Sequence, residues 1–379
     1  MPPRKPSRKP SDAEAPSRVE AGAIPAAELE ESFPELDLPV RPPFPPMEAK
    51  AVTELPAGEG WLFEPKWDGF RCLAFREGRQ VVLQSKATQP LARYFPELVE
   101  ALLALPASRF VLDGEIVVPV GGLLSFDDLL QRIHPAASRV RKLAAETPAT
   151  LLVFDLLVDG DGEALLSLPL AERRARLEAF FASVPAEGRV RLSPATRERE
   201  AAAAWLRDLA AGGLDGALAK DLDAPYRSGD RSAMRKVKVL RTADCVVGGF
   251  RYAQRGGEIG SLLLGLYDDE GRLDHVGFSS SFTVAERRAL APVVLERRGG
   301  PGFTGKAPGG PSRWSTERTA EWEPLRPDLV CEVRYDHFSG GRFRHGTKFL
   351  RWRPDKPAEQ CTFDQVRARM GGKEWRAIR

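Results

Sequence analysis

Lys66 lies among other charged residues in the apolar and aromatic segment WLFEPKWDGFRC, residues 61–72. Asp68 and Arg71 follow it with the spacing Lys-x-Asp-Gly-x-Arg, and Glu64 precedes it. A lysine amine can attack a phosphorus atom and hold the phosphoryl group as a phosphoramidate, provided that the amine has lost its proton. A lysine that simply extends from a strand into solvent is the common alternative. Chemistry at Lys66 therefore requires further charged groups nearby.

Further charged or aromatic segments follow Lys66 along the chain. They are LDGEIVV, LLVFDLL, LDGALAK and RKVKVL, which contain Glu115, Phe154, Asp215, Lys220, Lys236 and Lys238. Lys236 and Lys238 are separated by one residue on an expected strand, so they point to the same face. Nearby cations lower the pKa of a neighbouring ammonium and neutralise charge on a transferring phosphoryl group. Together the segments predict one phosphate-handling site around Lys66.

The carboxylates of Glu115 and Asp215 would repel a phosphate if they acted alone. They suit a divalent metal ion that bridges to phosphate, and oxygen ligands of this kind favour Mg²⁺, with Mn²⁺ as an alternative. Asp113-Gly114 and Asp215-Gly216 are also good turn signals, which is the structural alternative. We expect Glu115 and Asp215 to be metal ligands.

A mixed α/β domain, residues 39–240, is expected to position these side chains. The segment RCLAFREGRQVVLQS is typical of a hairpin that turns at Glu77-Gly78-Arg79, and ATLLVFDLLVDG of a buried strand. RFVLDGEIVV is expected to form two short strands broken at Asp113-Gly114. Helices are expected in SFDDLLQRI, with Ser125 as N-cap, in LPLAERRARLEAFFASV and in SPATREREAAAAWLRDLA.

A second, mostly β domain is expected over residues 241–379. DCVVGGFRYA, GSLLLGLYD and LDHVGFSSSF have the pattern of short strands, TVAERRALAPVVLERR that of a helix, and DLVCEVRYDHF and TKFLRWR that of later strands. This combination fits a small barrel of the OB type. Residues 1–38 lack apolar periodicity and are expected to form a disordered, basic, proline-rich tail.

The segments around KWDGFR resemble those of the covalent nucleotidyltransferases, namely ATP-dependent DNA ligases, RNA ligases and mRNA capping enzymes. RFRHGTKFLRWRPDK, RTADCVVGGFRYAQ and PPFPPMEAK resemble the small C-type ATP-dependent DNA ligases of bacteria and the ligase module of bacterial end-joining enzymes. The resemblance implies an α+β fold, with an adenylyltransferase domain of antiparallel sheets and helices followed by an OB-fold β-barrel. It also implies that the protein uses ATP to seal nicks in DNA repair, through lysyl-AMP and DNA-adenylate.

The same resemblance assigns roles to individual residues. Lys66, Lys236, Lys238, Asp355 and Lys356 would be catalytic. Glu64 would read the adenine amino group, Arg71 would contact ribose and phosphate, and Phe154 would stack on adenine. The full nucleotide-binding set would be Glu64, Arg71, Lys86, Glu115, Phe154, Lys220, Lys236, Lys238, Lys348 and Arg353. Lys86 stands where the family usually has arginine, and Asp215 where it has glutamate, so the charge is kept and the geometry altered.

Composition and charge limit the classes that remain. No segment approaches the roughly 20 uninterrupted apolar residues of a membrane span, and the start lacks the apolar core of a secretory signal, so we expect a cytoplasmic, nucleoid-associated protein. The four cysteines stand too far apart for a zinc knuckle. The net charge of the chain is only +3, but the segment from Cys331 to the last residue contains twelve Lys or Arg and only six Asp or Glu. This basic end could face phosphates, although a solvated charged face that helps solubility is the alternative. The resemblance implies nicked double-stranded DNA as the partner of a monomer, with a repair polymerase or end-binding proteins as further partners.

Two other classes of function stay open from the residues alone. A capping enzyme or RNA ligase shares the lysine and most motifs, although RWRPDK argues against it. A non-catalytic nucleic-acid-binding module would be expected to have lost Lys66, Glu115, Lys236 or Lys238, and all are present. An NAD-dependent ligase is disfavoured because the residues before Lys66 leave no room for a nicotinamide-recognition domain.

Overall fold

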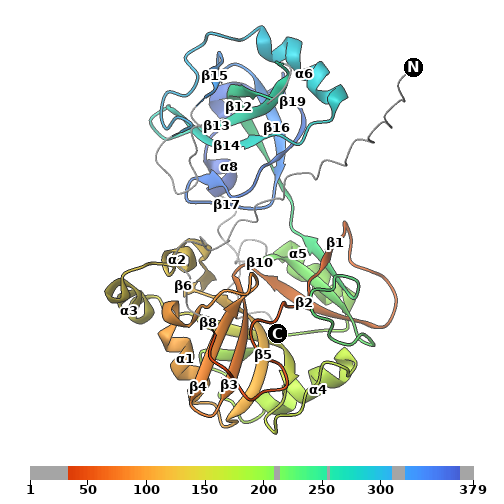
Figure 1. Ribbon diagram of the computed structural model, residues 1–379. Coiled ribbons are helices and arrows are strands. Elements are labelled where there is room, and N and C mark those ends of the chain that lie inside the picture. The colour runs from red at the N-terminus through yellow and green to blue at the C-terminus, as the bar shows by residue number, and fades with distance from the viewer. Residues whose placement is uncertain (1–32, 209–213, 254–256, 310–320, 368–379) are drawn as a thin grey trace, which may run out of the picture.

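The computed structural model describes residues 33–208, 214–253, 257–309 and 321–367. The chain forms two domains that lie one above the other in Figure 1. The strands and helices of the N-terminal domain are β1 (Lys50–Ala51), β2 (Trp61–Trp67), β3 (Phe70–Glu77), β4 (Gln80–Ser85), α1 (Pro96–Leu103), β5 (Arg109–Val117), β6 (Pro119–Val120), β7 (Leu123–Leu124), α2 (Phe126–Gln131), α3 (Ala137–Glu146), β8 (Thr150–Val158), α4 (Leu170–Phe181), β9 (Val190–Leu192), α5 (Arg199–Asp208), β10 (Leu214–Asp221) and β11 (Met234–Lys238).

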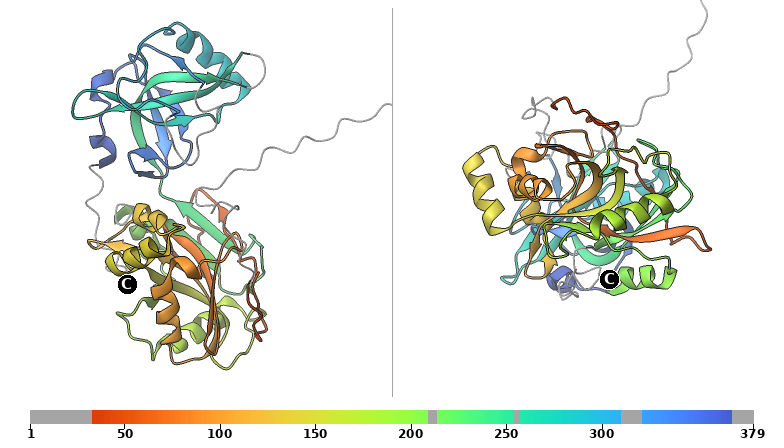
Figure 2. Two further views of the ribbon diagram at one scale, coloured as in Figure 1. Left: turned by 60° about the vertical axis from the view of Figure 1, so that its left-hand side comes forward. Right: turned by 90° about the horizontal axis from the view of Figure 1, so that it is seen from below.

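Two sheets form the centre of this domain. One has the order β4-β3-β5-β8-β9, and the other the order β1-β11-β10-β2. Helices α1 and α4 share one core cluster with the first sheet, and α5 packs on the second through Trp205. Figure 2 shows these helices on the outside of the sheets. The expected hairpin, buried strand and helices are confirmed, including Ser125, whose hydroxyl accepts the backbone N–H of Asp128 at the start of α2.

The expected break at Asp113-Gly114 is wrong. β5 runs without interruption from Arg109 to Val117, although its register against β8 shifts between Val111 and Leu112 and again between Asp113 and Gly114. Asp113 is fully buried, so it does not lie in a surface turn. A Cβ on Gly114 would approach the carbonyl oxygen of Leu152 to 2.7 Å, so glycine is required for close strand packing instead.

The expected boundary of the tail also needs correction. Residues 1–32 lie outside the described residues, whereas Leu36 and Leu38 are buried against Val82 and Val111 on the first sheet. Apolar side chains that cover a sheet face contribute to its core. The packed part of the domain therefore begins before residue 39.

The C-terminal domain is mostly β, as expected. Its elements are β12 (Arg241–Tyr252), β13 (Ile259–Tyr267), β14 (Leu273–Ser279), α6 (Val284–Leu295), β15 (Glu323–Pro324), β16 (Val330–Tyr335), β17 (Phe338–Ser339), β18 (Arg342–Phe343), β19 (Lys348–Trp352) and α8 (Asp364–Arg367). The main sheet has the order β14-β13-β12-β16-β19, and β15 pairs with β12. A single bridge between Ser279 and Thr347 joins its outer strands. Within the described residues this arrangement is not a closed barrel.

Helix α6 shows how local sequence sets one element of this domain. The Thr283 hydroxyl accepts the backbone N–H of Glu286, and the Glu286 carboxylate accepts the backbone N–H of Thr283. This reciprocal pair satisfies two donors at the helix start. No described helix is long and apolar enough to cross a membrane.

Candidate active site

Three neighbouring strands bring the predicted site residues together. Gly216 of β10 pairs with Lys66 of β2 on one side and with Lys238 of β11 on the other. Asp215 falls at a register shift between Leu214 and Gly216, so it interrupts the regular alternation of β10. Its Oδ2 atom accepts a hydrogen bond from Lys66 Nζ and lies 4.0 Å from Lys238 Nζ. The structure therefore joins Lys66, Asp215 and Lys238 in one charged cluster.

Gly216 makes this close approach of strands feasible. Its φ is +155°, which side chains other than hydrogen rarely permit, and a Cβ there would lie 2.0 Å from the carbonyl oxygen of Val237. The Asp-Gly pair at 215–216 lies within β10, so the turn that the sequence left open as an alternative does not form there. The glycine allows the close approach of β11, and the aspartate side chain contacts Lys66.

Burial and neighbouring carboxylates act on the charge of Lys66 in opposite directions. Burial opposes its charged form, but the carboxylates of Asp215, Glu115 and Asp68 outweigh burial and raise the pKa of Lys66 above its ordinary value. An ammonium has no lone pair with which to attack phosphorus. The Lys66 amine would therefore have to lose a proton before it could attack phosphorus.

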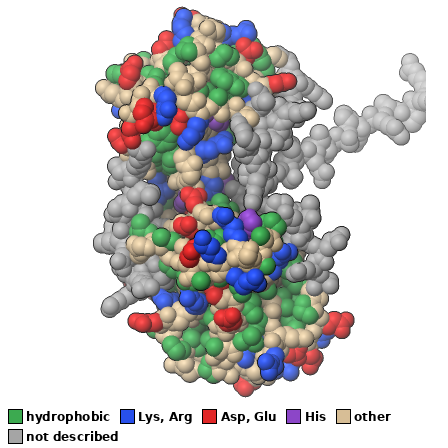
Figure 3. Space-filling view, turned by 90° about the vertical axis from the view of Figure 1, so that its left-hand side faces the viewer, with side chains coloured by type: hydrophobic (Ala, Val, Ile, Leu, Met, Phe, Trp, Pro, Cys, Tyr) green, Lys and Arg blue, Asp and Glu red, His purple; other side chains and the backbone are tan. Residues whose placement is uncertain are grey.

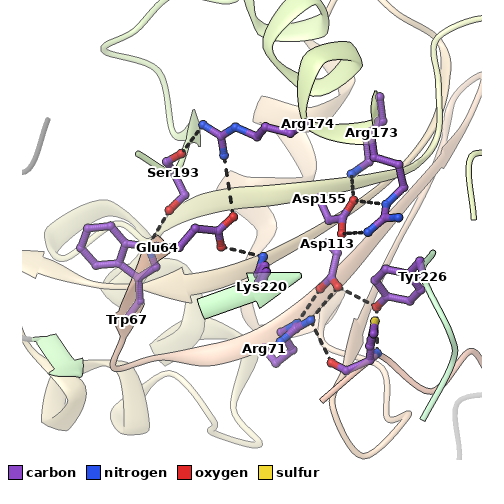
Figure 4. Close-up of polar contacts among 12 residues, drawn as sticks. Glu64, Trp67, Arg71, Asp113, Asp155, Arg173, Arg174, Ser193, Lys220 and Tyr226 are labelled. Atoms are coloured by element: carbon purple, nitrogen blue, oxygen red, sulfur yellow. Dashed lines mark hydrogen bonds and ion pairs between the residues drawn. The ribbon is translucent and has the colours of Figure 1, made fainter. Parts of the chain in front are cut away.

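Arg71 is fixed by two residues that the sequence analysis assigned no role. Its Nε and Nη2 atoms each donate to Asp113 at 2.6 Å, and the Tyr226 hydroxyl donates to the same carboxylate at 2.7 Å (Figure 4). The Met47 backbone N–H donates to the Tyr226 oxygen at 2.9 Å. A planar guanidinium that meets a buried carboxylate with two hydrogen bonds has a defined orientation. The Arg71 guanidinium lies 4.6 Å from the centre of the Phe154 ring.

Glu64 and Lys220 form a buried ion pair that also lies near Phe154. Lys220 Nζ lies 2.6 Å from Glu64 Oε2, although not in hydrogen-bond geometry, and 4.3 Å from the Phe154 ring centre. Arg174 of α4, also missed from the sequence, lies 4.0 Å from Glu64 and donates to the backbone oxygen of Ser193. Figure 4 shows Glu64 directed toward both cations. The Phe154 ring therefore lies close to cationic groups from both β3 and β10.

Glu115 differs from the other acidic residues of the site. It pairs in register with Arg71 across β3 and β5, and Gly69 gives its side chain room, since a Cβ there would lie 2.8 Å from Glu115 Cγ. Within the described part of the chain its carboxyl has no hydrogen bond or ion pair. Burial raises the pKa of Glu115 to about 7, while the Arg71 and Lys66 cations oppose this shift. Glu115 is therefore a carboxyl with free acceptor capacity beside Lys66.

The donor set around Lys66 suits a cation that also binds phosphate. Among the residues that the structure describes, no three His, Cys, Asp or Glu side chains converge as a complete metal cage. Mg²⁺ usually takes one or two carboxylates and completes its shell with water and substrate phosphate. Glu115 and Asp215 supply carboxylate oxygens of this kind, so they fit such an ion.

Of the other predicted residues, Lys86 and those near the C-terminus make their contacts outside this cluster, while Lys236 lies on one of its three strands. Lys86 pairs with Glu48 at 3.1 Å. In the C-terminal domain, Arg353 donates to Asp244 at 2.8 Å and to Asp355 at 2.8 Å, and Lys356 lies 3.9 Å from Asp244. Lys348 is exposed at the start of β19, and Lys236 lies on β11 opposite Leu218. Arg353 and Lys356 therefore contact Asp244, within the C-terminal domain.

A different part of the C-terminal domain contacts the site. Arg344 donates to both oxygens of Asp68, at 2.7 and 2.9 Å, and His337 Nε2 lies 3.3 Å from the same carboxylate. Asp336 accepts a hydrogen bond from Lys238 at 2.8 Å. The sequence analysis assigned none of these three C-terminal residues, because nothing in their spacing links them to a lysine about 270 positions earlier.

Comparison with known proteins agrees with this geometry. Residues 46–238 match the family described as ATP dependent DNA ligase domain, and residues 255–356 match the ATP dependent DNA ligase C terminal region. DNA ligase C2 of Mycolicibacterium smegmatis is 46% identical over 347 residues, which cover 87% of this chain and 96% of that protein. DNA ligase C of Mycobacterium tuberculosis is 44% identical over 346 residues, with the same coverage. The crystal structure of the ligase domain of M. tuberculosis LigD is 27% identical, with a TM-score of 0.44, and covers 84% of this chain and 98% of that one.

The fold and the site define a nucleotidyltransferase domain of mixed α/β structure with a C-terminal domain appended. The chain belongs to the ATP-dependent DNA ligases, and it is similar to mycobacterial ligases named DNA ligase C over nearly their whole length. ATP is the nucleotide of this family, and DNA is its substrate.

Proposed function

We propose that this ligase seals nicks in duplex DNA and that Lys66 carries AMP from ATP to the DNA. The observation that best supports this role is the contact of Lys66 with Asp215 and the nearby Lys238, on three adjacent strands. A nucleophile flanked by a carboxylate and a second cation has both a proton acceptor and a partner for phosphate charge. DNA repair is the process in which such sealing would serve.

The reaction consists of three phosphoryl transfers. Lys66 Nζ forms a bond to the α-phosphorus of ATP while the bond to pyrophosphate breaks. An oxygen of the DNA 5′-phosphate then attacks that phosphorus and displaces the lysine. Finally the 3′-hydroxyl attacks the DNA phosphorus, forms the phosphodiester bond and releases AMP. Each transfer depends on positioning and charge stabilisation more than on new covalent partners.

The adenosine end of the nucleotide would lie against Phe154. Its ring lies close to Arg71 and Lys220, and both cations have buried carboxylate partners in Asp113 and Glu64. Buried ion pairs of this kind hold side chains in one orientation. Arg71 would contact ribose and phosphate, and Glu64 the adenine amino group.

Glu115 and Asp215 would hold Mg²⁺, or Mn²⁺, beside the nucleotide phosphates. A bound divalent cation supplies charge stabilisation to the transferring phosphoryl group. Asp215 also accepts the Lys66 hydrogen bond, so its position links the nucleophile to the metal ligands. Glu115 contributes a carboxyl that no described partner occupies.

The C-terminal domain would be an OB-type domain that binds DNA. The strand order and the Ser279–Thr347 bridge are consistent with a partly closed barrel. Arg353, Asp355 and Lys356 would reach the nucleotide only after this domain moves, because their polar contacts lie around Asp244. We infer a monomer that acts on DNA with a repair polymerase or end-binding proteins nearby.

The decisive test is incubation with ATP labelled at the α-phosphate, followed by mapping of the labelled residue. Wild-type protein should carry the label on Lys66, and Lys66→Arg should carry none, because the guanidinium stays protonated. Lys50→Arg is the matched control, since Lys50 is exposed on the same sheet and should not affect labelling. Label that persists in Lys66→Arg would overturn the assignment.

A further inference from the structure

The segment of residues 336–345, which we call the docking hairpin, carries the polar contacts between the two domains beside Lys66. Arg344 binds Asp68 with two hydrogen bonds, and its guanidinium also lies 3.7 Å from the centre of the Phe126 ring. The backbone N–H of Gly340 donates to Asp127 at 3.1 Å. Figure 3 shows Lys, Arg and His side chains gathered where the domains meet. The docking hairpin is therefore held to the N-terminal domain through the carboxylates of Asp68 and Asp127.

Asp336 is the member of this hairpin that reaches a predicted catalytic lysine. Its Oδ2 atom accepts a hydrogen bond from Lys238 at 2.8 Å, while His345 Nδ1 lies 3.0 Å from the same oxygen. Arg241 donates to the Asp336 backbone oxygen at 2.8 Å, which fixes the start of the hairpin. Although burial favours the neutral acid, hydrogen bonds from His345 and Lys238 lower the pKa of Asp336 well below its usual range. The group facing Lys238 is thus a carboxylate.

A carboxylate in this position conflicts with a nucleotide triphosphate at the same lysine. Lys238 already lies 4.0 Å from Asp215, so Asp336 is the second carboxylate near its ammonium. Bringing phosphates to Lys238 would place like charges together in a partly buried site, where repulsion is stronger than in water. Either Asp336 or the phosphates can have the closest contact with Lys238.

We propose that Asp336 is a positioning residue that competes with the phosphates of ATP for Lys238, so that hairpin docking and ATP binding exclude each other. This rests on the proposed function, since it takes Lys238 as a phosphate contact. The docked arrangement then belongs to the protein after pyrophosphate has left. It also explains why Arg353 and Lys356 contact Asp244, within their own domain, in the docked arrangement.

The first test measures lysyl-AMP formation as a function of ATP concentration. Because a competing state lowers apparent affinity in proportion to its population, Asp336→Asn should lower the KM for ATP by about fivefold to tenfold. Its rate at saturating ATP should stay at the wild-type value, and Asp336→Glu should restore the wild-type KM. Asp328→Asn, an exposed aspartate paired with Arg297 in the same domain, is the matched control and should change neither value.

The second test holds the hairpin in its docked position. Cysteines introduced at Asp127 and Ser339 can be joined with a short, reducible bis-maleimide, and the four native cysteines are buried and should not react. The cross-linked protein should form lysyl-AMP at least about tenfold more slowly at subsaturating ATP, and reduction should restore the rate.

The outcomes separate this proposal from the proposed function. If the wild-type protein forms no lysyl-AMP, both the proposed function and the competition between Asp336 and ATP are contradicted. If the wild-type protein adenylates normally but the KM of folded Asp336→Asn is unchanged or raised, only the competition is contradicted. The same conclusion follows if the cross-linked protein adenylates at the rate of the protein without the cross-link. A lowered KM for Asp336→Asn together with slow adenylation after cross-linking supports it.

Discussion

Replacing Glu115 with glutamine should stabilise the ligand-free protein above neutral pH and abolish lysyl-AMP formation. The Glu115 carboxyl lies beside Lys66 and Gly69, in register with Arg71, and has no hydrogen bond or ion pair within the described residues. Burial raises its pKa from 4.5 to about 7. The charged form of this carboxyl is therefore unfavourable unless a cation binds to it.

The magnitude follows from the two pKa values. Below about pH 4.5 Glu115 is protonated in both the folded and the unfolded chain, so its ionisation does not lower the free energy of unfolding. As pH rises toward 7 the unfolded chain releases its proton first, so the free energy of unfolding falls. A shift from 4.5 to about 7 corresponds to a total loss of about 3 kcal/mol. Glutamine keeps the shape and removes this loss.

Urea unfolding of wild type and Glu115→Gln at two pH values tests this reasoning. Between about pH 5.5 and about pH 8, the free energy of unfolding of Glu115→Gln relative to wild type should rise by about 2 kcal/mol. Glu100→Gln, a change at an exposed carboxylate of α1, should show no such pH-dependent difference. A constant gap, or a variant less stable than wild type at the higher pH, would refute the argument from burial.

Three further outcomes are expected. Asp113→Asn should lower the free energy of unfolding by about 3–5 kcal/mol in urea titrations, because it leaves the Arg71 guanidinium without its buried partner; a loss near zero would contradict this. Lys356→Ala should block self-adenylation yet leave sealing of a nick that already carries 5′-AMP nearly intact, whereas Lys236→Ala should impair both; equal losses in Lys356→Ala would exclude a role restricted to the first step. Nick sealing should weaken as salt is added, since DNA binding releases counterions, and a rate independent of salt would rule out phosphate contacts as the main source of affinity.

Local pattern predicted most elements of this fold, and its main failure is informative. The turn at Glu77-Gly78-Arg79 located the β3–β4 hairpin, a continuous apolar run located β8, and the Ser125 N-cap located the start of α2. At Asp113-Gly114 the same logic failed, because an Asp-Gly pair has one sequence signature and two physical uses. In β5 the glycine permits contact with Leu152 and the aspartate binds Arg71, and both depend on strands far away in sequence.

The parts of the candidate site that the sequence did not predict are likewise set by long-range contacts. Tyr226 reaches Asp113 across 113 positions, and Arg344 reaches Asp68 across 276. Arg174 lies beside a second arginine on an amphipathic helix, where a charged residue is ordinarily solvated. Only the packing of α4 against β8 and β9 distinguishes it, by directing its guanidinium toward Glu64 and Ser193.

The charges around Lys66 also bear on when this residue could react. Asp215, Glu115 and Asp68 raise the pKa of Lys66 despite burial, so its amine favours the protonated form. Nucleotide phosphates alone would add negative charge and raise that pKa further. If Asp336 and the phosphates compete as proposed, Lys238 would offset part of this charge once Asp336 has released it. A divalent cation held by Glu115 and Asp215 would add positive charge beside the amine. On this proposal Lys66 would act as a nucleophile only when its substrate is in place.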